Sequence, residues 1–108
     1  MSDQRFIIEM GMGNDLHGGD YTKAAKRAVE DALHGATLAI LGNLPNLKSD
    51  LRVKVTIGVQ EPDQIDTETV KALLPVGEVS VHVKKGGLNV GDAVVAQAAI
   101  EAFLPFQG

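Results

Sequence analysis

Two ionisable side chains that could exchange protons lie close together near the start of the sequence. Asp15 and His17 fall within "GMGNDLHGGD", residues 11–20, a segment that also contains four glycines. Histidine titrates near neutral pH and serves as a general acid or a general base, and a neighbouring carboxylate can orient its ring. The spacing therefore predicts an acid–base pair. His17 would transfer the proton, and Asp15 would orient the imidazole ring or stabilise its positive charge.

The glycines of this segment predict a ligand-binding loop. A helix is expected to begin at Asp20, and the free N–H groups at a helix N-terminus attract anions. Glycine also lets a bound group approach the backbone closely. We therefore expect a small anionic ligand to lie here. The predicted contacts are Gly11, Gly13, Asn14, Gly18 and Gly19.

The standard phosphate-binding motifs do not fit this segment. The dinucleotide motif G-x-G-x-x-G would need a glycine where Leu16 stands, and the P-loop motif would need a lysine where Gly19 stands. A metal site needs three or four ligands, and the other histidines, His34 and His82, are remote in sequence. No metal is predicted, and the cofactor stays unassigned.

Three functional interpretations remain open. The protein could be an enzyme acting on a small anionic metabolite, a non-catalytic ligand-binding or interaction module, or a structural oligomer. In the structural oligomer the loop would make a tight turn against a neighbour, with both side chains packed into a subunit contact. Without any function in this pair, Asp15 would form an Asx-turn and His17 would be an ordinary polar loop residue. A mutually hydrogen-bonded Asp15–His17 pair that lines a cleft would favour the enzyme. A loop facing open solvent would favour the binding module.

Residue periodicity predicts the elements that position this segment. Strands are expected at 4–10, 51–59, 76–84 and 93–100, and helices at 20–34 and 66–74. The alanines of the last strand would suit a helix, but a third helix would leave only three strands to cover. The fold class is therefore α/β (α+β), with a single layer of helices on a four-stranded mixed sheet. The order is β-α-β-α-β-β.

Further details of the first strand and the first helix follow from their apolar residues. Phe6, Ile8 and Met10 share one face of the strand, and Asp20 is a suitable N-cap for the helix. Alanines at helical spacing would let the helix sit close to the sheet: Ala24, Ala25, Ala28 and Ala32, followed by Leu33. This helix ends at Gly35 or continues, bent, to about Leu41. Asp66 is expected to cap the second helix.

Two helices can cover only one face of such a sheet. The other face is expected to be either solvated or paired across a subunit interface, which its mixed charges suit. Its residues would be Arg5, Glu9, Arg52, Lys54, Thr56, Glu78, Ser80, His82, Lys84, Gln97 and Glu101. Because two helices leave this mixed-charge face uncovered, we expect a homo-oligomer.

Lys84 and Lys85 precede a Gly-Gly turn. This pattern suits an anion site or an exposed hairpin.

Composition excludes several classes of protein. The 108 residues carry a net charge of −4, without a basic patch interleaved with aromatic residues, so no nucleic-acid partner is predicted. There is no cysteine, and no apolar run approaches the ~20 residues of a membrane span. The first residues, "MSDQRFII", lack the layout of a signal peptide. We expect one domain, 1–108, in the cytoplasm.

The run from Gly11 to Gly18 fits the pattern G-x-G-x-D-x-H-G at every fixed position. This signature resembles a small family of bacterial proteins of unknown function, with plant relatives that carry a long extra N-terminal segment. The resemblance extends through "VTIGVQEPDQID", "LLPVGEV" and "KKGGLNV". It implies no activity, but a fixed Asp and His beside fixed glycines favour a site.

The predicted element order is also similar to that of the Bacillus chorismate mutase-like fold. Members of that fold are often trimers whose active sites lie between subunits. By this analogy a trimer is expected rather than a dimer. None of that enzyme's binding arginines can be placed in this sequence, so mutase activity is not predicted.

Overall fold

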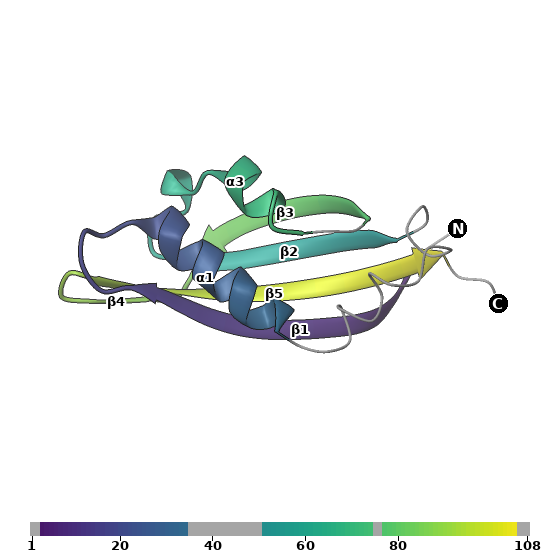
Figure 1. Ribbon diagram of the computed structural model, residues 1–108, viewed down its shortest axis with the longest axis horizontal. Helices are drawn as coiled ribbons and strands as arrows, with labels where there is room; N and C mark the ends of the chain where they lie inside the picture. Colours follow the sequence, from purple (N-terminus) through teal and green to yellow (C-terminus); the bar gives the residue numbers. More distant parts are fainter. Residues whose placement is uncertain (1–2, 35–50, 75–76, 106–108) are drawn as a thin grey trace.

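The computed structural model describes residues 3–34, 51–74 and 77–105, which form an α+β fold with one mixed sheet (Figure 1). Within them the order is β1 (Asp3–Asp15), α1 (Tyr21–Leu33), β2 (Arg52–Val59), the one-turn helix η2 (Pro62–Gln64), α3 (Thr67–Lys71), β3 (Glu78–Lys85), β4 (Leu88–Val90) and β5 (Ala93–Pro105). The alternatives for the end of the first helix, Gly35 or Leu41, lie outside the described residues.

The C-terminal strand lies at the centre of the sheet. The strand order is β1-β5-β2-β3, and β4 also pairs with β5. β5 runs antiparallel to both β1 and β2, whereas β2 and β3 are parallel. Figure 1 shows α1 lying across β1 and β5, with α3 beside β3 on the same side. No described helix is long and apolar enough to cross a membrane.

The short strand β4 is a departure from the predicted order, which had a turn at this point. The chain leaves β3 and crosses the end of β2, where the N–H of Gly86 donates to the carbonyl oxygen of Val59 at 2.8 Å. Gly87 has a φ of 66° and lies against the backbone of Gly58 and Val95, where a side chain would not fit. The crossing brings Leu88–Val90 alongside β5 beyond the end of β2. The fold therefore has a fifth strand that periodicity alone did not indicate.

β2 and β5 confirm the predicted alternation. In β2 the valines and Ile57 are buried, while Arg52 and Lys54 are exposed. Residues 93–105 form a strand rather than a helix, and Ile100 is fully buried at its centre. The core between the sheet and the helices therefore consists largely of Val, Ile and Ala side chains of the strands, which pack against α1 and α3.

Both helices begin at the predicted aspartates. The side chain of Asp20 accepts a hydrogen bond from the backbone N–H of Lys23 at 3.1 Å. Asp66 accepts bonds from the hydroxyl of Thr69 at 2.8 Å and from its backbone N–H at 3.3 Å. These bonds favour the ionised carboxylate and hold the pKa of Asp66 below its ordinary value. α3 ends at Lys71, earlier than the predicted residue 74.

The orientation of β1 is opposite to the one predicted from its hydrophobic residues. The face that was expected to pack against α1 points away from the helix. Ile7 is buried beneath the helix layer, whereas Ile8 and Met10 point away from it and are exposed. A β-bulge interrupts the pairing between Arg5 and Ile7. The physical reason for the orientation lies farther along the strand, at the glycines.

β1 and α1 pack backbone against backbone. A Cβ on Gly13 would overlap the backbone N of Ala28 and the carbonyl oxygen of Ala24, and a Cβ on Gly11 would overlap the backbone of Ala32. The three alanines are buried, as their spacing predicted. No side chain larger than a hydrogen atom fits at positions 11 and 13, so these two glycines must face the helix.

Replacing Gly13 with alanine tests this contact. Gly13→Ala is expected to lower the free energy of unfolding by about 1–3 kcal/mol or more, because the added methyl group forces α1 away from β1. Gly58→Ala is the matched control: it also lies in a strand, but its Cβ would meet no heavy atom closer than 3.5 Å. Urea denaturation measures both variants. Equal effects would contradict the proposed packing.

Candidate functional site

The first half of the glycine-rich segment is strand rather than loop. Residues 11–15 belong to β1, and only residues 16–20 connect it to α1. Gly11 and Gly13 pair with Ala98 and Ala96 of β5. The prediction of a continuous loop over 11–20 is therefore wrong in its first half, because β5 supplies pairing partners as far as Asp15.

Asp15 lies at the start of α1, where its carboxylate organises the connection between strand and helix. The residue is only 3% exposed. One carboxylate oxygen accepts the backbone N–H of Asp20 at 2.9 Å, and the other lies 3.6 Å from Nζ of Lys23. The helix N-terminus thus already has two carboxylates, those of Asp15 and Asp20. This arrangement disfavours an additional anion at that point.

His17 points elsewhere. Its side chain is 90% exposed, and its Nδ1 lies 3.7 Å from the carboxylate of Asp92, in the turn between β4 and β5. No hydrogen bond or ion pair joins Asp15 to His17 among the contacts of the described residues. Within the same residues, no three His, Asp or Glu side chains gather as a metal site would require.

The glycines and the asparagine that were predicted to bind a ligand also have local partners. Gly18 and Gly19 adopt positive φ angles, 94° and 62°, which turn the chain into the helix. The backbone carbonyl of Asn14 accepts a hydrogen bond from Arg27 of α1 at 2.7 Å. The backbone N–H of Met12 donates to Asp31, one helical turn farther on, at 3.0 Å. Side chains of α1 therefore satisfy part of the free edge of β1.

The face of the sheet opposite α1 and α3, here called the open face, carries most of the large hydrophobic side chains that are exposed among the described residues. Six large hydrophobic side chains are exposed in the described part of the chain. Five of them occupy register positions on this face: Ile8, Met10, Met12, Leu88 and Val90. Glu9, predicted for the open face, alternates with Ile8 and Met10 and so faces the helix side. The open face is therefore less polar than predicted.

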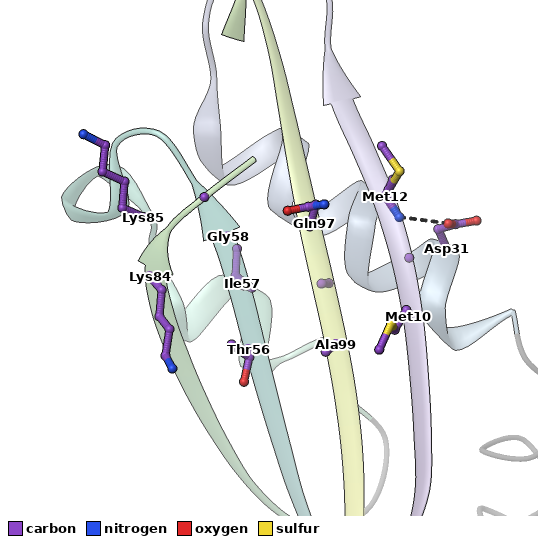
Figure 2. Close-up of a pocket in the computed structure, with 13 residues that line it drawn as sticks. Met10, Met12, Asp31, Thr56, Ile57, Gly58, Lys84, Lys85, Gln97 and Ala99 are labelled. Atoms are coloured by element: carbon purple, nitrogen blue, oxygen red, sulfur yellow. Dashed lines mark hydrogen bonds between the residues drawn. The ribbon is translucent and has the colours of Figure 1, made fainter. Parts of the chain in front are cut away.

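A groove of about 730 Å³ runs along the open face (Figure 2). β1 forms one wall with Met10 and Met12, which are 71% and 60% exposed. β3 forms the opposite wall with Lys84. The floor between them comes from β2 and β5, with the small residues Thr56, Gly58 and Ala99 and the larger Gln97. Neither Asp15 nor His17 lines this groove.

The charges around the groove are unequal. Figure 2 shows Lys84 running along the β3 side of the groove, while Lys85 points away from it. Asp31 lies at the outer rim, beyond β1, where its carboxylate accepts the N–H of Met12 at 3.0 Å. Gln97 adds an exposed amide. The groove therefore combines an apolar wall with a wall bearing one ammonium group.

Sequence reasoning missed this groove, although a signal was present. Gly11 and Gly13 alternate with Met10 and Met12, and an alanine-rich helix follows. A strand with glycine at alternate positions lets an alanine face approach its backbone closely, and the intervening methionines then lie on the other face. Three of the groove residues, Thr56, Lys84 and Gln97, were correctly assigned to the open face, but as part of a charged surface.

Comparisons with known proteins agree with this fold. The chain matches the family model of the Lin0512 family of conserved hypothetical proteins over residues 5–103. The protein belongs to this family. It is also similar to a solved structure, an FtsZ-like protein of unknown function from Nostoc punctiforme, with 32% sequence identity and a TM-score of 0.86. That alignment covers 98% of this chain and 99% of the other. No curated protein matches the sequence.

Variants of Asp15 and His17 test whether Asp15 stabilises the fold while the exposed His17 does not. Asp15→Ala is expected to lower the free energy of unfolding by about 1.5–3 kcal/mol, because the N–H of Asp20 loses a charged acceptor. His17→Ala is expected to change it by less than about 0.5 kcal/mol, since the side chain is exposed. Thermal and urea denaturation measure both. A near-neutral Asp15→Ala variant would contradict the structural role.

Proposed function

We propose that the protein is a non-catalytic binding module that works as a homo-oligomer, with the open face of the sheet as its contact surface. The observation that carries this proposal is that, of the six large hydrophobic side chains exposed in the described part of the chain, five gather on that one face. Large apolar patches on soluble proteins mark interaction sites. Their burial stabilises an assembly by about 25 cal/mol for each Å² of apolar surface.

A second copy of the chain is the partner that the charges of this face favour. Arg5 pairs with Glu101 at 3.1 Å, and Lys54 lies directly opposite Glu101 in the register of β2 and β5. A face with both signs of charge beside apolar residues can complement another copy of itself. Such an interface should bury upwards of about 1,000 Å² in total.

The element order predicted from the sequence is similar to that of the Bacillus chorismate mutase-like fold, and on this analogy we propose a trimer rather than a dimer. This is an analogy between folds, and it carries no activity to this chain. The description of the Nostoc protein as FtsZ-like likewise names a resemblance, for a protein whose function is itself unknown. The main support for self-association is therefore the open face itself.

The G-x-G-x-D-x-H-G signature is consistent with a mainly structural purpose. Gly11 and Gly13 admit the backbone of α1, Asp15 holds the helix start, and Gly18 adopts a positive φ. His17 is the fixed position that has neither a packing nor a turn role. An acid–base function of Asp15 and His17 on a small anionic metabolite stays a prediction, and it would require the two side chains to approach each other.

The oligomeric state of charge-introducing variants tests the proposal. The wild-type protein is expected to be oligomeric at micromolar concentration by multi-angle light scattering. A Met10→Lys, Met12→Lys double variant is expected to be monomeric, because four lysines or more would face each other across a two-fold or three-fold contact. Circular dichroism should remain unchanged, since both methionines are exposed.

Ala72→Lys is the control, because Ala72 is exposed at the end of α3 on the helix side of the molecule. It should leave the assembly intact. A monomeric wild-type protein, or an oligomer that survives the methionine substitutions, would overturn the proposal.

A further inference from the structure

The groove is a recess within the open face. Its floor consists mainly of small residues, with the amide of Gln97 at one end, while methionines and a lysine form its walls. If two such faces pack together, the walls meet before the floors do, and part of the recess stays unfilled. Empty apolar space inside an interface costs the packing contacts of its lining. An occupant with the right chemistry would therefore stabilise the assembly.

The two walls favour different parts of such an occupant. Met10 and Met12 offer unbranched, polarisable side chains that adapt to varied apolar shapes. Lys84 offers an ammonium group on the opposite wall, and no ion-pair partner for it occurs among the described residues. Thr56, on the floor between these walls, adds a hydroxyl group that can donate a hydrogen bond.

We propose that the groove binds a small amphipathic carboxylate, a molecule with an apolar body and one carboxylate group. The apolar body lies against Met10 and Met12, and the carboxylate meets Lys84 and the hydroxyl of Thr56. The volume of about 730 Å³ falls within the range of about 300–1,000 Å³ that is typical of small-molecule sites. This inference rests on the proposed function, because it assigns a ligand class to the same face.

A monoanion fits better than a more highly charged ligand. One ammonium group faces the groove, since Lys85 points away from it. Phosphate groups are generally bound by several cationic or backbone donors, which the groove lacks among its described residues. The carboxylate of Asp31 at the rim would also repel a second negative charge. A neutral apolar molecule would leave the ammonium group of Lys84 without a counter-charge.

Paired probes of equal shape test the charge requirement. The probes are 4-phenylbutyrate and its uncharged amide, titrated into the ¹⁵N-labelled full chain and followed by chemical shifts in NMR spectra. We expect the carboxylate to shift the backbone signals of Thr56, Gly58 and Ala99. The amide is expected to bind at least about tenfold more weakly, because it lacks the charge-assisted hydrogen bond.

Substitutions then locate the site. Lys84→Gln is expected to reduce the affinity for the carboxylate to that for the amide, whereas Lys85→Gln is the matched control and should leave both affinities unchanged. Ala99→Leu places a larger side chain on the groove floor and should abolish binding of both probes. Circular dichroism confirms that each variant is folded.

The outcomes separate this inference from the proposed function. Equal affinities for the two probes, shifts outside the groove, or an unchanged affinity in Lys84→Gln would overturn the inference, as would the absence of binding. Light scattering on the same samples reports assembly independently. A monomer that binds the carboxylate through Lys84 would contradict the proposed self-association but not the ligand class. An oligomer that binds neither probe would contradict the ligand class but not the self-association.

Discussion

The close contact between β1 and α1 determines much of the remaining structure. Gly11 and Gly13 let the alanine face of the helix approach the strand until backbone meets backbone. Because these glycines occupy the inner face, the large side chains of this part of β1 must lie on the outer face. Met10 and Met12 are exposed for that reason, and they form one wall of the groove. A packing requirement on one side of the sheet therefore creates apolar surface on the other.

The same contact explains why the N-terminal segment is more structural than its composition suggests. A helix this close to an edge strand can reach the strand's free backbone groups, and Arg27 and Asp31 bond to Asn14 and Met12. Edge strands with unpaired backbone groups are prone to unwanted pairing, so this coverage protects β1. Asp15 completes the arrangement, since its buried carboxylate ties the end of the strand to the start of the helix.

Local patterns predicted what depends on local forces. The alternation of β2, the helix-capping aspartates and the alanine face of α1 all follow from neighbouring residues, and each is confirmed. The orientation of β1 was not predictable from its hydrophobic residues, because the glycines that decide it have no hydrophobic signal of their own. β4 depends on where β2 ends relative to β5, and the groove depends on the register of four strands. The relative ends and the register of strands that are far apart in the chain do not affect the local periodicity of the sequence, so they could not be predicted from it.

The β-bulge in β1 gives the open face its mixed character. Arg5 and Ile8 both face outward, although a regular strand would place residues an odd number apart on opposite faces. Arg5 can therefore bind Glu101, while Ile8, Met10 and Met12 continue as an apolar row. A face adapted only to water would have polar residues at these positions. The combination of an ion pair at one end with exposed methionines beside a recess is the observation from which the proposed self-association follows.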